Sequence, residues 1–212
     1  MQGVCQTSRL LPQKTPQTPN QLCCRRFLEF LQHFQITIGA IDCTHRERYE
    51  AAILCYGKAV QIKPDWARAW LNLGKAYKQL HSYAETLACC DRAIAINPEE
   101  YWAWMLRGSV LLSLQNHSEA IVALDKAIQI NPEKHEAWYQ RGRVLEELQQ
   151  WETAASCYKR ATQIHPNLPA MWCRQGNALL QAERYPDAVA AYERALKLVS
   201  TNGEAWLNRG LA

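Results

Sequence analysis

The chain has 212 residues and a net charge of +4, and its acidic and basic side chains are interspersed. Because no run of like charges stands out, the charge pattern excludes a dedicated surface for nucleic acid or for an anionic membrane. Apolar residues make up 48% of the sequence, which indicates a folded protein rather than a disordered one.

Residues 1–26 are predicted to form a flexible tail, because they are rich in Pro, Gln and Thr and show no helical period. They contain no continuous apolar segment typical of a secretory signal, so we expect a reducing, cytoplasmic setting. Cys23 and Cys24, followed by Arg25 and Arg26, suit lipid attachment. The interpretation we favour is that the following stretch, 27–34, is a helix that packs on the first repeat, without membrane contact.

From residue 70 onward, tryptophan recurs every 34 residues. Glycine follows each tryptophan four positions later, and alanine and proline recur with the same period. A period of this length is typical of a solenoid, in which each unit touches only its neighbours. The tryptophans are Trp70, Trp104, Trp138, Trp172 and Trp206, the glycines are Gly74, Gly108, Gly142, Gly176 and Gly210, and the prolines are Pro64, Pro98, Pro132 and Pro166.

Each unit is predicted to contain two helices. Trp104, Gly108 and Leu111 share one face of a first helix, and the apolar residues between 120 and 128 mark a second one after a polar turn. The second helix should end at Asn131, because the residue before Pro132 disfavours helical geometry. We expect Pro132 to open the first turn of the next helix. Ser200 replaces this proline in the fifth unit and leaves the end of its second helix open.

The recurring small residues indicate close contact between helices. A glycine inside a helix costs about 1 kcal/mol relative to alanine, so its repetition favours a position where a side chain would not fit. The alanines of the second helix, such as Ala127 and Ala161, have the same interpretation. We expect the tryptophans to fill the core rather than to bind a ligand.

These positions together resemble the tetratricopeptide repeat, most closely at Trp70, Leu73, Gly74 and Tyr77. The resemblance implies an all-α solenoid of antiparallel helix pairs that coil into a right-handed superhelix. Residues 27–200 would hold five units, the first of them degenerate because Ile36 replaces tryptophan. Residues 201–212 would form the first helix of a truncated sixth unit.

No pattern in the sequence supports catalysis, a cofactor or a metal. There is no GxSxG, P-loop or HExxH motif, and the six histidines are dispersed. The nine cysteines do not have the spacing of a metal site, since Cys89 and Cys90 are adjacent. Cys90 replaces a tyrosine or leucine of the other units, which predicts a buried free thiol. We therefore predict that the protein is not an enzyme.

A groove on the first helices is the candidate site. The residues that follow each tryptophan and each glycine are rotated by about 100° from the packing stripe and are expected to be free to face a partner. In similar tetratricopeptide proteins this stripe lines the concave surface. The predicted groove residues are Leu71, Asn72, Lys75, Met105, Leu106, Ser109, Tyr139, Gln140, Arg143, Cys173, Arg174 and Asn177.

Apolar side chains flanked by amides and cations suit a peptide with apolar anchors and some acidic groups. We therefore predict a non-catalytic interaction scaffold with a protein or peptide partner. The alternative is a regulatory or substrate-docking arm of a larger enzyme or signalling protein. The dicarboxylate clamp of chaperone-binding relatives is missing, because Leu71 and Lys75 stand where it needs Lys and Asn.

Overall fold

The structure is a computed structural model that describes residues 44–212. The chain divides into two units, Met1–Asp42 and Cys43–Ala212, and the helices below all belong to the second unit. The predicted tail, the stretch 27–34, Ile36 and the pair Cys23 and Cys24 lie outside the described residues.

The described residues form ten α-helices and no strand. Their bounds are α2 (Thr44–Ile62), α3 (Ala67–Gln79), α4 (Tyr83–Ile96), α5 (Tyr101–Ser113), α6 (His117–Ile130), α7 (His135–Glu147), α8 (Trp151–Ile164), α9 (Pro169–Gln181), α10 (Tyr185–Leu198) and α11 (Gly203–Leu211). This confirms an all-α fold.

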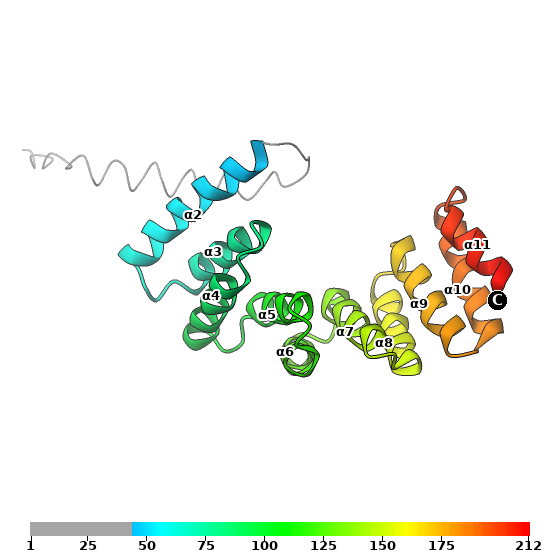
Figure 1. The fold of residues 1–212 in the computed structure, drawn as a ribbon. Coiled ribbons are helices and arrows are strands. Elements are labelled where there is room, and N and C mark those ends of the chain that lie inside the picture. The colour runs from blue at the N-terminus through cyan, green and yellow to red at the C-terminus, as the bar shows by residue number, and fades with distance from the viewer. Residues whose placement is uncertain (1–43) are drawn as a thin grey trace, which may run out of the picture. The chain divides into compact units, whose positions relative to one another are not determined.

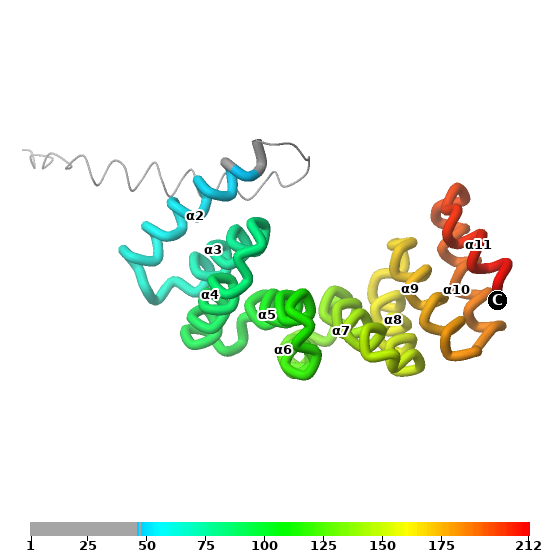
Figure 2. Tube along the Cα trace, viewed as in Figure 1, coloured from blue at the N-terminus to red at the C-terminus, as the bar shows by residue number. Residues whose placement is uncertain are grey.

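The helices follow one another as antiparallel pairs, α3 with α4, α5 with α6, α7 with α8 and α9 with α10 (Figure 1). The Cα trace in Figure 2 shows the same succession of hairpins. Each pair packs on the next, and first helices also touch one another, α3 with α5 and α5 with α7. The solenoid predicted from the repeat is confirmed.

The turn between units explains where each second helix ends. Asn131 ends α6 in an extended conformation, and its side-chain oxygen accepts a hydrogen bond from the Glu133 N–H at 3.2 Å. Pro132 lies in this turn and α7 begins only at His135, so the expectation that Pro132 opens the helix is wrong. Residues 131–134 form a turn that the Asn131 side chain stabilises, and the helix starts only after this turn. In the fifth unit Val199 is extended without a following proline, and α10 ends at the equivalent residue.

Direct contact between paired helices accounts for the recurring glycines. A Cβ on Gly142 would lie 2.7 Å from the Tyr158 ring, and one on Gly176 would lie 2.5 Å from Tyr192. At Gly108 the nearest atom, Leu124 Cγ, would be 2.6 Å away. All these separations are shorter than carbon atoms tolerate. The predicted close approach is therefore confirmed.

Each hairpin closes through a residue with left-handed backbone geometry. In the third complete hairpin, Gln149 has a φ of 57°. Its N–H bonds the Glu146 carbonyl, and the Gln150 N–H bonds the Leu145 carbonyl, both at 2.9 Å. This pair of bonds is the Schellman motif, which favours glycine at the left-handed position. The equivalent residues of the other hairpins are His81, Gln115 and Glu183.

The cysteines of the described residues are free thiols, and four of them are buried. Burial raises the pKa of Cys89 to about 11 and, together with the neighbouring Cys89 and Asp91, that of Cys90 to about 12. The buried thiol predicted at Cys90 is confirmed. Among residues 44–212 no helix is long and apolar enough to cross a bilayer.

Candidate functional site

The structure places all twelve predicted groove residues on the first helices of the pairs, α3, α5, α7 and α9. Their exposure differs. Lys75 and Arg174 are exposed, and six others are half-buried. Four are buried, contrary to the prediction that these positions are free to face a partner. These four are Leu71, Leu106, Ser109 and Cys173, with exposed fractions of 4%, 5%, 6% and 5%.

Contact between neighbouring units causes this burial. Leu71 of α3 and Leu106 of α5 belong to the same apolar cluster, which also contains Cys90. Cys173 of α9 shares a cluster with Ala205 of α11. The predicted exposure was based on rotation about a single helix axis, which takes no account of a neighbouring unit. The next unit then covers one side of that face.

Four predicted groove residues meet at one cavity of about 560 Å³. Tyr139 comes from α7, whereas Cys173, Arg174 and Asn177 come from α9. The remaining lining residues are Pro169, Ala170, Asn202 and Glu204. The Tyr139 ring, the proline and the alanine supply apolar surface, and the other residues supply polar groups. A hollow of this kind can hold an apolar side chain while the rim bonds a peptide backbone.

Asn177 fixes the polar side of this cavity. Its side-chain oxygen accepts hydrogen bonds from the Tyr192 hydroxyl at 2.8 Å and the Asn208 amide at 2.9 Å. Its own amide donates to Glu204 at 3.3 Å. Burial raises the pKa of Tyr192 to about 12, so this hydroxyl stays protonated and keeps donating at neutral pH. The cavity wall is therefore preorganised across α9, α10 and α11.

Arg174 connects two units beside the same cavity. Its Nη1 lies 3.1 Å from Oε2 of Glu146, whose side chain is 14% exposed. Burial lowers the pKa of the Arg174 guanidinium, but Glu146 and the other partners raise it more strongly and the net shift is upward. The pair thus remains ionised. It joins α9 to α7, and the Arg174 side chain remains 46% exposed.

Two further cations lie on first helices, Lys78 on α3 and Arg143 on α7. The Lys78 ammonium donates a 2.8 Å hydrogen bond to the hydroxyl of Ser109, which in turn donates to the Leu106 carbonyl. Arg143 Nη1 bonds Gln140 at 3.2 Å. Burial lowers the pKa of Lys78, and the positive charge of Arg143 lowers it further. The Lys78 bond joins α3 to α5, whereas the Arg143 bond stays within α7.

An aromatic side chain lies between two further lysines. The ring of Trp102 has Lys75 Nζ at 5.6 Å and Lys134 Nζ at 4.5 Å from its centroid. These are cation–π contacts. Burial lowers the pKa of Lys75 despite the nearby Glu100 carboxylate. Because Lys75 and Lys134 come from different units, this contact joins α3, α5 and the start of α7.

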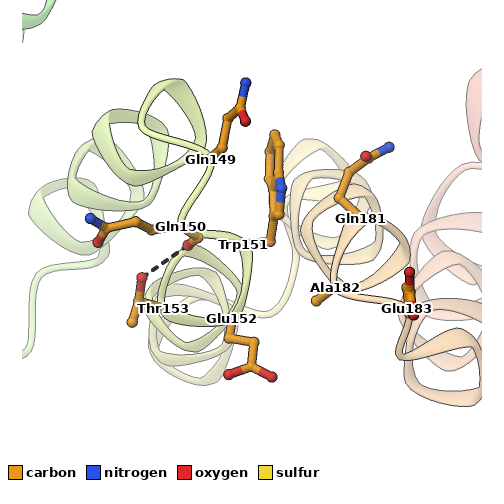
Figure 3. A pocket seen from close by; sticks show the side chains of 8 residues that line it. All are labelled: Gln149, Gln150, Trp151, Glu152, Thr153, Gln181, Ala182 and Glu183. Atoms are coloured by element: carbon orange, nitrogen blue, oxygen red, sulfur yellow. Dashed lines mark hydrogen bonds between the residues drawn. The ribbon is translucent and has the colours of Figure 1, made fainter.

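A separate hollow of about 490 Å³ lies at the hairpin turns rather than in the groove. Figure 3 shows the Trp151 indole standing between Gln149 and Gln181 there. Thr153 donates a 2.9 Å hydrogen bond to the Gln150 carbonyl. Within residues 44–212 no group of histidine, cysteine or carboxylate side chains could hold a metal ion.

Five residues in or near the predicted groove could not be listed from the sequence alone. Lys78 lies four positions after Gly74, one turn beyond the positions that were considered. Pro169, Ala170, Asn202 and Glu204 lie at the starts of α9 and α11. A signal was present for two of these four, because Ala170 and Glu204 occupy equivalent places in successive units, two positions before the recurring tryptophan.

The fold and the site define a class of protein, a helical repeat array of the protein-interaction type. A TPR repeat model matches residues 43–81 and 176–212, and two tetratricopeptide repeat models match residues 73–137 and 135–178. These matches extend over the entire second unit. The chain belongs to the tetratricopeptide repeat family.

Solved structures share the fold. MamA is 21% identical with a TM-score of 0.68, and the match covers 78% of this chain and 99% of MamA. YrrB, described as a TPR protein with an unusual peptide-binding site, is 21% identical with a TM-score of 0.65, covering 79% and 86%. A thermophilic TPR protein of Thermus thermophilus is 18% identical with a TM-score of 0.61, covering 90% and 97%. No curated protein matches the chain.

Proposed function

We propose that the chain is a non-catalytic scaffold that binds a peptide segment along its first helices. One observation carries this proposal. Tyr139, Arg174 and Asn177 converge from two units on a single cavity whose lining includes both apolar and polar side chains. The peptide-binding site named for YrrB supports the same function for a similar fold.

The cavity has the features that peptide recognition needs. A side chain entering it would displace water from Tyr139, Pro169 and Ala170, and hydrophobic burial contributes roughly 25 cal/mol per Å². Arg174 and the amides at the rim can bond backbone carbonyls of the bound segment. Because Asn177 is already held by Tyr192 and Asn208, little side-chain entropy would be lost on binding.

The test fills the cavity without disturbing the core. Ala170 is exposed and lines the cavity on α9, so Ala170→Tyr places a ring where the peptide side chain would enter. Ala95 is an exposed alanine of α4 outside the cavity, and Ala95→Tyr is the matched control. The probe is a fluorescein-labelled pool of capped decapeptides with one fixed leucine, measured by fluorescence anisotropy.

We expect Ala170→Tyr to weaken binding by about tenfold or more, as for loss of an anchor side chain. Ala95→Tyr should bind as the wild type does, and circular dichroism should show both variants folded. The proposal is wrong if the wild-type chain does not bind the pool, or if Ala170→Tyr binds it with unchanged affinity.

A further inference from the structure

A repeated ion pair crosses three of the junctions between units. In each case an arginine on a first helix meets a carboxylate that lies sixteen residues earlier, on the second helix of the preceding unit. Such a charge-assisted hydrogen bond joins the two helices. The pairs are Arg107 with Asp91 at 3.1 Å, Arg141 with Asp125 at 2.7 Å and Arg209 with Glu193 at 3.2 Å.

The junction between α8 and α9 departs from this pattern. Lys159 occupies the place of the carboxylate, and Gln175 occupies the place of the arginine. Within residues 44–212, Lys159 takes part in no ion pair. A cation therefore lies where the other three junctions have an anion, and no protein carboxylate neutralises it there.

Gln175 is a buried side chain with unused donors. Its exposed fraction is 9%, and its Oε1 accepts a 3.1 Å hydrogen bond from the hydroxyl of Thr162. This bond fixes the orientation of the amide. The Nε2 group has two N–H donors, and neither has a partner in the part of the chain that the structure describes. Buried donors of this kind are costly unless another molecule accepts their hydrogen bonds.

Lys159 and Gln175 line the same cavity, which has a volume of about 300 Å³. Arg194 of α10 also lines it and has no ion pair among the described residues. Two further charged lining residues, Arg184 and Asp187, neutralise each other. The lining thus carries two cations without a counter-charge. Its apolar walls include Ala155, Trp172, Leu179 and Ala191.

We infer that this cavity binds a small organic carboxylate with an apolar body. The carboxylate takes the place of the acidic side chain that the other junctions supply, and it accepts hydrogen bonds from Lys159 Nζ and Gln175 Nε2. The apolar body packs against Trp172 and Leu179. The indole N–H of Trp172 is already bonded to the Pro166 carbonyl, so the ring offers apolar surface to the ligand.

The size and position of the cavity define the ligand further. Its volume lies at the lower end of the range for ligand pockets, roughly 300–1,000 Å³, which suits a small acid. The cavity shares no lining residue with the groove cavity beside Tyr139. The inference therefore does not depend on the proposed peptide-binding function, and either can fail without the other.

The experiment uses hexanoate as the probe and hexanamide as a neutral control of nearly the same shape. Both are titrated into the full chain at constant ionic strength, up to the millimolar concentrations expected for a ligand of this size. Ligand-observed NMR gives the affinities, and the side-chain amide resonance of Gln175 reports the place of binding. Lys159→Met removes the cation. Lys126→Met removes the same charge at an exposed position of α6 outside the cavity.

We expect the wild type and Lys126→Met to bind hexanoate about tenfold more tightly than hexanamide, as for a charge-assisted hydrogen bond. Lys159→Met should bind both probes equally. The inference is overturned if hexanoate causes no saturable shift of the Gln175 amide, if the wild type does not distinguish the probes, or if Lys159→Met keeps the preference.

A double variant, Lys159→Asp with Gln175→Arg, restores the pair found at the other junctions. It should remain folded by circular dichroism and should no longer bind hexanoate, because a protein carboxylate then occupies the site. Retained binding by the folded double variant would overturn the inference. Acetate tests the apolar walls and should bind the wild type at least about tenfold more weakly than hexanoate, since it buries little apolar surface. Equal affinities for acetate and hexanoate would overturn the assignment of an apolar body.

Discussion

The indole Nε1 of Trp138 donates a hydrogen bond to the carbonyl oxygen of Pro132, with 2.9 Å between the two atoms. The same bond joins Trp70 to Pro64 and Trp104 to Pro98. It recurs at Trp172 with Pro166, and in the last unit Trp206 bonds the carbonyl of Ser200. The acceptor is a main-chain carbonyl oxygen, so the bond does not require a proline at that position. Each tryptophan thus connects its helix to the turn six residues earlier.

Trp138→Phe should lower the free energy of unfolding by about 1 kcal/mol, the usual net value of one hydrogen bond, plus a small loss of packing. The phenyl ring keeps most of the apolar contact but has no donor. Pro132→Ala is the control, because it keeps the carbonyl. Urea denaturation measures both variants, and equal stability of Trp138→Phe and the wild type would show that this bond contributes nothing.

Gly142→Ala should destabilise the fold by about 1–3 kcal/mol, because the new methyl group overpacks against Tyr158. Gly57 is also inside a helix, but a Cβ there meets no atom within 4 Å. Gly57→Ala should therefore stabilise α2 by up to about 1 kcal/mol through helix propensity. Thermal denaturation of the two variants should give shifts of opposite sign. Two shifts of the same sign would contradict the packing argument.

Gln149→Gly should stabilise the fold by roughly 0.5–1 kcal/mol, because glycine adopts the left-handed geometry of this turn without steric cost. The φ of 57° at Gln149 is native and would not need to change. Gln163→Gly, at an exposed position inside α8, should instead cost about 1 kcal/mol. Chemical denaturation distinguishes the two. A destabilising Gln149→Gly would mean that the glutamine side chain has a role of its own.

Stability should fall as the pH rises above about 8.5, the pKa of an unfolded thiol. Burial holds the pKa of Cys90 at about 12 and that of Cys89 at about 11, so the folded state keeps protons that the unfolded state releases. The contribution of each thiol is complete below the unfolded pKa and decreases by up to about 1.4 kcal/mol per pH unit above it.

Denaturation at several pH values under reducing conditions checks this dependence. The difference in free energy of unfolding between the wild type and Cys90→Ala should be constant below about pH 8. It should become smaller above that pH, because the unfolded thiol ionises with a pKa of about 8.5. A constant difference up to pH 10, about 1.5 units beyond that pKa, would show that Cys90 is accessible to hydroxide in the folded state.

Interactions within one unit were predictable from the sequence. The spacing of Trp104 and Gly108 predicted the first helix, and the repetition of glycine predicted the contact that Gly142 makes with Tyr158. Periodicity detects such features because both partners lie in the same hairpin. The left-handed turn at Gln149 could not be predicted, because this position holds glutamine and not the glycine that favours this geometry.

Interactions between units were less predictable. Leu71 and Cys173 are buried because the next unit covers them. The helical period predicts which residues share one face of a helix, but it does not predict the rotation between units. The same rotation brings Lys78 of α3 to Ser109 of α5, 31 residues later in the sequence. Tyr139, Arg174 and Asn177, which the sequence placed in the groove, line one cavity where two units meet.

The main-chain acceptor of each tryptophan has a consequence for how such an array can change in length. A segment from Pro98 to Asn131 contains both the donor and the acceptor of its own indole bond. Duplication or deletion of one full period therefore preserves that bond in every copy, whatever residue follows the preceding asparagine. The number of units can therefore vary in evolution or by design without compensating substitutions at the tryptophans.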